Sequence, residues 1–279
     1  RYIGLGTHLK FYVNQGASYH DVTPIRSTTS AGDVTFAATN GSSTITATDT
    51  AHGANVNDFV TFSDAASLGG NVTAAVLNQE YQIASVPTAN TFTFVAKDTS
   101  GTTVTANASD SGNGGSSTVG AYQIGVGLNA YVEGTGWGAG AWGEGTFGSV
   151  SSLSASSQLR LYSQDNFGED LVFNVRAGGV YYWDESSGTS SRAVGLSSLS
   201  GASNTPTVAL QVMVSDVDQH VICFGANPIG SSNIDPLFVR WSDQESAADW
   251  TPTATNTAGG SRINSGSTIV GAVQSRQEI

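Results

Sequence analysis

Carboxylates recur in closely spaced groups along the second half of the chain. The groups are Asp165 with Glu169 and Asp170, Asp184 with Glu185, Asp216 with Asp218, and Asp243 with Glu245 and Asp249. Hydrolysis of a glycosidic bond needs two carboxylates that face one sugar across a cleft. All these acids stand in turn-like contexts, where Asp is favoured because it caps its own backbone. We therefore expect solvated turn acids here, foremost Asp165, Glu169, Asp170, Asp243 and Glu245.

The other residues that could do chemistry form no recognisable motif. The four histidines are scattered and make no HExxH pattern, and no GxSxG or GxxxxGK[ST] motif is present. Cys223 stands in the apolar run VICF, which predicts a small buried hydrophobe and not a reactive thiol. The sequence therefore predicts no catalytic, cofactor-binding or metal-binding residues, and no enzyme.

Tryptophans are the second conspicuous residue type. Trp137 and Trp142 are separated by glycines and alanines, while the others stand in apolar runs, at Trp183, Trp241 and Trp250. Aromatics spaced in this way can form a platform on which sugar rings stack, or they can pack between strands where glycine permits close approach. We favour packing or interface contacts for all five.

These residues are carried by a repeating strand–turn–strand pattern. Its longest copy is LRLYSQDNFGEDLVFNVRAGGVYYWD, residues 159–184, and shorter echoes lie at 212–225 and 238–252. In the long copy Leu171, Phe173 and Val175 alternate with Val172 and Asn174, as expected for a strand, and the glycines of RAGG permit positive φ in the connection. With 34 Gly and few Lys or Leu, the chain is expected to form almost no helix.

Composition divides the chain into two parts. Residues 33–121 hold no Trp, carry seven acids against one Lys, and show turn signals about every ten residues between short strands. This predicts a small β-barrel or sandwich inserted into a second domain made of residues 1–32 and 122–279. In the strand expected at 91–96, Phe92 and Phe94 point one way and Thr91, Thr93 and Val95 the other. The Gly-rich run 109–120 is expected to be a flexible loop that leaves the insert.

The formal net charge of −12 restricts the partners. It argues against ordinary nucleic-acid binding, which relies on clustered cations, and against attraction to anionic membranes. No signal peptide or transmembrane segment is recognisable. The abrupt start at RYIGLG and the alternating VQSRQEI at the other end predict that the chain is part of a longer polypeptide.

Several stretches together resemble a bacteriophage tail protein, nearest to the tail nozzle or tail hub of short-tailed phages. They are GTHLKFYV with DVTPIR, GTGWGAGAWGEGTFG, RLYSQDNFGEDLVFN, GGVYYWD and VRWSDQESAADWTP, within residues 1–32 and 122–279. The insert is similar to small β-barrel modules of phage structural proteins, through TITATDTAHGANVNDFVTFSDA and TFTFVA. The resemblance implies an all-β fold, with a β-propeller-like platform of antiparallel hairpin blades and an inserted small β-barrel or sandwich domain.

The resemblance also implies a function. It implies a virion structural protein in the phage tail, a homohexameric ring below the connector, contacts with connector or adaptor and tail fibre proteins, and no membrane insertion. Double-stranded DNA would pass through the channel without specific binding, because an acidic lumen repels phosphate. A host-surface glycan-binding adhesin, tail fibre or spike remains an alternative, and a propeller glycosidase is a third.

Overall fold

The computed structural model describes residues 2–129 and 159–275. Their secondary structure is almost entirely antiparallel β-strand, which confirms the predicted all-β fold class. One short α-helix, α1 (Ala74–Leu77), and two 3-10 turns, η2 (Glu185–Ser187) and η3 (Leu196–Ser198), are the helical elements of the described ranges. The scarcity of helix follows from a sequence rich in Gly, Ser, Thr and Val.

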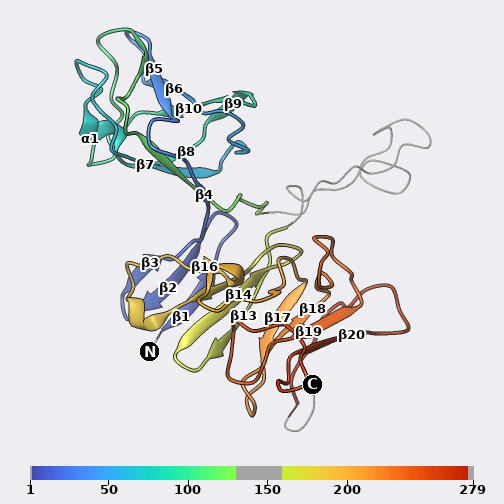
Figure 1. The fold of residues 1–279 in the computed structure, drawn as a ribbon. Helices are drawn as coiled ribbons and strands as arrows, with labels where there is room; N and C mark the ends of the chain where they lie inside the picture. The colour runs from blue at the N-terminus through green and yellow to red at the C-terminus, as the bar shows by residue number, and fades with distance from the viewer. Residues whose placement is uncertain (1, 130–158, 276–279) are drawn as a thin grey trace, which may run out of the picture. The chain divides into compact units, whose positions relative to one another are not determined.

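The chain divides into two compact units (Figure 1). The platform unit comprises Arg1–Pro24 and Gly127–Ile279, and the insert unit comprises Ile25–Val126. The sequence placed the boundaries at 32/33 and 121/122. The difference arises because β4 (Ile25–Thr28) pairs with β12 (Val119–Gln123), with Thr28 opposite Ala121, so both strands belong to the insert unit.

The insert unit contains two antiparallel sheets. One has the order β11-β5-β6-β10-β9, and the other has the order β4-β12-β7-β8. The remaining strands span Thr35–Ala38 (β5), Thr44–Thr48 (β6), Phe59–Ser63 (β7), Glu80–Gln82 (β8), Ser85–Thr88 (β9), Thr91–Val95 (β10) and Asp110–Asn113 (β11). The run 109–120 was expected to be a loop, but it forms β11 and the start of β12.

The core of the insert unit is aromatic. Phe92 and Phe94 of β10 are fully buried, as their alternation with Thr91, Thr93 and Val95 predicted. Phe62 lies between them, with ring centroids 6.3 Å from Phe92 and 5.4 Å from Phe94. Burial of such rings is the main force that holds the two sheets of so polar a sequence together.

The described residues of the platform unit form three antiparallel sheets, each made of strands consecutive in the chain (Figure 1). The first sheet is β1 (Ile3–Gly6), β2 (Phe11–Gln15) and β3 (Ser18–Asp21). The second is β13 (Tyr162–Phe167), β14 (Asp170–Val175), β15 (Val180–Trp183) and β16 (Val194–Gly195). The third is β17 (Gln211–Val214), β18 (Val221–Phe224), β19 (Phe238–Trp241) and β20 (Gly259–Arg262).

The second sheet lies between the other two and is buried on both faces. Phe173 of β14 packs with Phe11 of the first sheet, whereas Val172 packs in the cluster that contains Val212 and Val221 of the third sheet. This is the alternation that the sequence predicted for 171–175. Each sheet can bury its apolar face only against a neighbouring sheet, so the layers depend on one another.

Ion pairs add a polar anchor between the first and second sheets. Asp21 accepts from Lys10 Nζ at 2.8 Å and pairs with Arg192 Nη1 at 2.7 Å, and Arg192 also donates to the Thr23 carbonyl at 3.2 Å. Burial raises the pKa of the Asp21 carboxyl, but hydrogen bonds from Lys10 and Thr23 and the Lys10 charge outweigh it, so this pKa lies below its usual value.

Two turn predictions can be compared with the backbone. The β13–β14 hairpin turns at Gly168 and Glu169, because Phe167 pairs with Asp170 and Gly168 has φ of 66°. In the RAGG connection the positive φ of 58° falls on Ala177 and not on a glycine, so that prediction was wrong. A Cβ at Gly179 would lie 2.4 Å from the Tyr181 hydroxyl, which explains why a glycine stands there.

Cys223 should behave as an inert thiol until the platform unit unfolds. It is fully buried in β18, and burial raises its pKa to about 12. At pH 8 only about one molecule in ten thousand would carry the reactive thiolate, even if a reagent could reach it. We expect an aromatic disulfide reagent to label Cys223 only in denaturant, with the same midpoint as the loss of tryptophan fluorescence. Rapid labelling of the native protein would contradict this placement.

Candidate functional site

The first strands of the three platform sheets are joined by polar side chains. Ser163 and Asp165 of β13 point toward β17, where Ser163 Oγ accepts from the Val212 N–H at 2.8 Å and Asp165 Oδ2 accepts from the Val214 N–H at 2.9 Å. Gln164 points the other way, and its Nε2 donates to the Gly4 carbonyl of β1 at 3.0 Å. Side chains of one strand alternate in direction, so β13 reaches both neighbours.

Asp165 therefore has a structural position that the sequence did not predict. It was expected in the turn, but it lies within β13 opposite Val172, and its Oδ1 also accepts from the Asn166 N–H at 2.9 Å. The composition SQDNFGED marks a turn, but it does not say which two residues form the tip. The register places Gly168 and Glu169 there, three residues beyond Asp165.

Asp165→Ala should weaken the contact between the second and third sheets. The change leaves the partly buried N–H of Val214 without its charged acceptor, at a cost of about 1–3 kcal/mol. Asp165→Asn keeps an acceptor oxygen and should cost less than about 1 kcal/mol. Urea unfolding followed by tryptophan fluorescence would measure both, and equal effects of the two variants would contradict the assigned bond.

Two of the other predicted acids also hold the backbone. Asp170 Oδ1 accepts from the Glu185 N–H at 2.9 Å, and Asp170 Oδ2 accepts from the Tyr182 hydroxyl. Asp243 Oδ1 accepts from the Thr257 N–H at 2.8 Å and the Thr257 hydroxyl at 2.7 Å, and these bonds hold the pKa of Asp243 below its usual value. Neither carboxylate is free to act as a catalytic acid or base without loss of these bonds.

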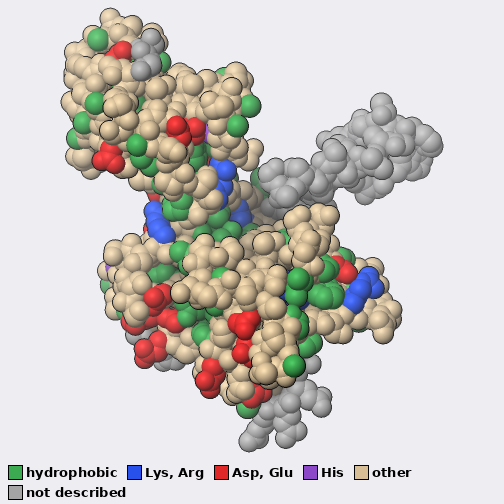
Figure 2. Space-filling view, in the orientation of Figure 1, with side chains coloured by type: hydrophobic (Ala, Val, Ile, Leu, Met, Phe, Trp, Pro, Cys, Tyr) green, Lys and Arg blue, Asp and Glu red, His purple; other side chains and the backbone are tan. Residues whose placement is uncertain are grey.

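Glu169 and Glu245 are the predicted acids that remain exposed. Glu169 stands at the tip of the β13–β14 hairpin, and Glu245 has a positive φ of 56° in the loop after β19. Figure 2 shows Asp and Glu side chains gathered on the platform unit at the end where the β13–β14 hairpin turns. These two glutamates offer negative charge to a partner without disturbing a hydrogen bond to the backbone.

The described tryptophans differ in exposure. Trp183 is 1% exposed and donates to the Ser191 carbonyl at 3.2 Å, and Trp250 is fully buried and donates to the Ala247 carbonyl at 2.9 Å. Neither indole face is available to stack on a sugar ring. Trp241 is half-buried on the outer face of the third sheet. Trp137 and Trp142 lie outside the described residues.

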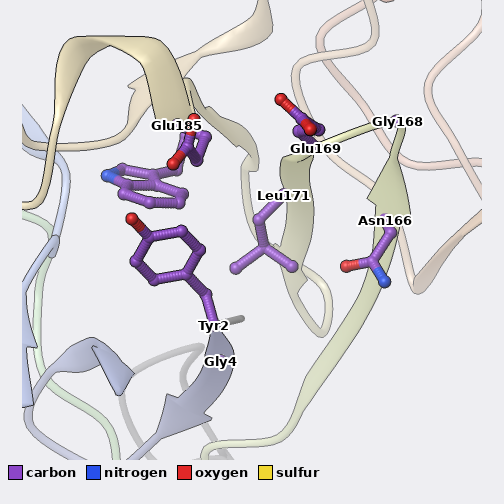
Figure 3. Close-up of a pocket in the computed structure, with 8 residues that line it drawn as sticks. Tyr2, Gly4, Asn166, Gly168, Glu169, Leu171 and Glu185 are labelled. Carbon is purple, nitrogen blue, oxygen red and sulfur yellow. The ribbon is translucent and has the colours of Figure 1, made fainter. Parts of the chain in front are cut away.

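The platform unit has a hollow of about 320 Å³ beside the β13–β14 turn (Figure 3). Tyr2, Asn166, Glu169, Leu171 and Glu185 are among the residues that line it. Figure 3 shows the Tyr2 hydroxyl directed toward Glu185, and the hydrogen bond between them raises the pKa of Tyr2. The wall thus combines an aromatic ring, an aliphatic side chain, an amide and two carboxylates. Such a set could hydrogen-bond the hydroxyls of a sugar.

Sequence reasoning missed most of this hollow. It singled out Glu169 and noted Glu185, but Tyr2 and Asn166 are brought to the same wall only by packing of the first sheet against the second. Tyr2 contacts Trp183 edge-to-face, with ring centroids 5.3 Å apart, although the two residues are far apart in the sequence. No local pattern could have indicated that pairing.

The described part of the chain shows neither a metal-binding cluster nor a membrane-spanning helix. Within residues 2–129 and 159–275, no group of three or more His, Cys, Asp or Glu side chains is arranged to hold a metal ion. None of the helices in these ranges is long and apolar enough to span a membrane.

Comparison with known proteins gives distant structural similarity only. No protein-family model matches the chain, and no curated protein matches it. Among solved structures, the chain is similar to the phage phi92 endosialidase, with 13% sequence identity and a TM-score of 0.28. The match covers 94% of this chain and 37% of the endosialidase chain, so this chain spans little more than a third of that protein.

Proposed function

We propose that this chain is a structural protein of a bacteriophage tail, and that it forms part of the nozzle or hub through which the genome leaves. The proposal rests on the resemblance of residues 1–32 and 122–279 to such proteins. The stacked antiparallel sheets of the platform unit are consistent with the blades which that resemblance implies.

The observation that carries a scaffold role is the use made of the carboxylates. Asp165, Asp170 and Asp243 each accept hydrogen bonds from backbone N–H groups, so these three carboxylates hold strands and loops in place. A hydrolase would instead keep a pair of such groups directed at a substrate. We therefore assign these acids to the architecture, and propose no catalysis and no cofactor.

The proposed channel is acidic. With a net charge of −12, a ring of six copies would repel DNA phosphates and let the duplex slide without specific binding. The exposed Glu169 and Glu245 are the candidates for facing the duplex. In this role the chain would meet a connector or adaptor protein on one side and tail fibre proteins on the other, within the virion.

The symmetry of the native assembly tests the proposal directly. Mass measurement and image averaging of assembled tails should show six copies of this chain in a ring around the genome channel. Three copies in an axial or lateral appendage would contradict the nozzle role and indicate a fibre or spike. Absence of the chain from purified particles would overturn the virion assignment altogether.

Charge reversal at the exposed glutamates should slow genome ejection. The double substitution Glu169→Lys and Glu245→Lys replaces two negative charges with two positive ones in each copy, which creates local attraction to phosphate in the channel. The neutral pair Glu169→Gln and Glu245→Gln is the matched control and should have a much smaller effect. Ejection kinetics measured by DNA-dye fluorescence would decide, and unchanged rates in the Lys variant would contradict an acidic lumen at these positions.

Glycan binding is the second candidate, and the hollow beside the β13–β14 turn is the observation that favours it. A glycan array probed with the native chain tests this role. Glu169→Gln and Asn166→Ala should abolish any signal, because both residues line the hollow and each could hydrogen-bond sugar hydroxyls. Release of oligosaccharides from a host polysaccharide would instead support a glycosidase.

A further inference from the structure

The hollow beside the β13–β14 turn adjoins a second hollow, and we call the two together the β1–β13 groove. The second hollow has a volume of about 450 Å³ and shares Tyr2, Gly4, Asn166 and Leu171 with the first. Figure 3 shows Tyr2 and Asn166 on opposite sides of the first hollow, with the Leu171 side chain between them. The groove therefore has room for more than one ring of an oligosaccharide, whereas a single amino-acid side chain would fill only part of it.

The walls of the β1–β13 groove offer more hydrogen-bond acceptors than donors. The Glu169 carboxylate and the Asn166 side-chain amide have no hydrogen-bond partner among the described residues. The Glu185 carboxylate accepts from the Tyr2 hydroxyl, so that hydroxyl is already used as a donor. A carboxylate only accepts, whereas an amide both donates and accepts. A ligand in the groove must therefore supply most of the donors.

The charge of the groove is negative. Glu169 and Glu185 line the first hollow, and Asp165 lines the second. Asp165 is bonded to the Val214 N–H at 2.9 Å, whereas Glu169 is exposed. Among the described residues that line either hollow there is no Lys, Arg or His. A sugar acid would bring a like charge against these carboxylates, whereas a protonated amine would complement them.

The Tyr2 ring gives the groove an aromatic surface. The ring is half-buried, and it is held by the hydrogen bond to Glu185 and by the edge-to-face contact with Trp183, with ring centroids 5.3 Å apart. The C–H face of a sugar can pack on such a ring while the polar groups of the sugar reach the rim. A cation close to an aromatic face gains a further attraction. The combination suits a positively charged sugar better than a neutral one.

We propose that the β1–β13 groove binds an oligosaccharide whose sugars carry free ammonium groups, and that it rejects acidic sugars. The inference rests on the glycan-binding candidate and names its ligand class. One ammonium would donate to Glu169 at the rim of the first hollow, the sugar ring beside it would lie on Tyr2, and hydroxyl groups would bond Asn166. The net charge of −12 would steer such a ligand toward the protein.

Calorimetric titration of the native chain with three trisaccharides tests the proposal. The probes are the trisaccharide of glucosamine, its N-acetylated form and trigalacturonate, at about pH 6, where the sugar amine keeps its proton. We expect the glucosamine trisaccharide to bind at least about tenfold tighter than the acetylated form, and trigalacturonate not to bind. The preference should weaken in about 0.5 M salt. Equal affinities for the amine and acetylated forms, or tighter binding of trigalacturonate, would overturn the proposal.

Variants at Glu169 separate the effect of charge from that of shape. Glu169→Gln removes the charge without breaking a hydrogen bond to any described residue, and it should weaken binding of the glucosamine trisaccharide at least about tenfold. Glu169→Asp keeps the charge and should retain most of the affinity. Glu245→Gln is the matched control, since Glu245 is exposed outside the groove and should not affect binding. Equal losses for Glu169→Gln and Glu169→Asp would show that charge does not select the ligand, and the proposal would be wrong.

The same titrations distinguish failure of this inference from failure of the glycan-binding candidate. If the acetylated trisaccharide binds as tightly as the amine form, glycan binding stands and the ligand class is wrong. If none of the trisaccharides binds, the glycan-binding candidate falls together with the inference. Tighter binding of a short peptide with one arginine, acetylated and amidated at its ends, would overturn the inference in favour of a basic protein partner. None of these results bears on the nozzle role, which the copy number of the assembly tests.

Discussion

Replacing Arg240 by alanine is expected to destabilise the platform unit by about 3–5 kcal/mol, the combined effect of lost hydrogen bonds and an unfilled cavity. Arg240 is 1% exposed in β19. Its guanidinium donates to the Asn227 carbonyl at 3.2 Å and to the Asn204 carbonyl, and lies over the Trp250 ring with its Cζ 5.7 Å from the centroid. The side chain thereby ties two loops to the third sheet.

The reason for so large an effect is that the Arg240 side chain is buried and that one of its partners, the Asn227 carbonyl, is buried with it. Removal of the guanidinium leaves the buried Asn227 carbonyl unsatisfied where water does not readily replace the lost donor. Burial also lowers the pKa of Arg240, because the charged guanidinium is poorly solvated there. Arg240→Lys should recover only part of the loss, because an ammonium cannot present the planar fork that meets both carbonyls.

Arg262 provides the matched control for this prediction. Its side chain is 54% exposed and pairs with Asp235 through a 2.8 Å contact. Exposed pairs contribute little, so Arg262→Ala should cost less than about 1 kcal/mol. Urea unfolding by tryptophan fluorescence would report both variants. Similar losses for Arg240→Ala and Arg262→Ala would show that the buried network is not a main support of the third sheet.

Sequence reasoning succeeded where a feature depends on neighbours along the chain. The alternation of Phe92 and Phe94 with threonines fixed which face of β10 is buried, and the alternation around Phe173 gave β14. Period-two patterns are reliable because successive side chains of a strand must point to opposite faces.

The features that were missed depend on residues far apart in the sequence. Pairing of β4 with β12 moved both domain boundaries, because strand partners separated by about ninety residues leave no local signal. Asp165 was placed in the turn because composition marks a turn without fixing its register. The RAGG connection is a similar case. Glycine favours a positive φ, so the sequence indicated Gly178 or Gly179, but the positive φ falls on Ala177.

Phe173→Ala should also destabilise the platform unit by about 3–5 kcal/mol. Phe173 is fully buried, and its ring stacks on that of Phe11 with centroids 3.8 Å apart and planes 1° apart. The substitution removes a stacked aromatic contact between the first and second sheets and leaves a cavity that two strands of fixed register cannot close. Phe11→Ala should have an effect of the same order, because it removes the other half of the contact.

The positions of the tryptophans allow the loss of stability to be assigned to one unit. All five tryptophans lie outside Ile25–Val126, so tryptophan fluorescence follows the platform unit alone. Phe11→Ala and Phe173→Ala should shift that transition, and the double variant should show a coupling of about 0.5–1.5 kcal/mol. Phe92→Ala is the control, since it lies in the core of the insert unit and should leave the tryptophan transition in place. Phe11 and Phe173 are far apart in the sequence, so their rings meet only when the platform unit is folded. A fluorescence transition that Phe11→Ala leaves unmoved would therefore mean that the strand carrying Phe11 does not stabilise the platform unit.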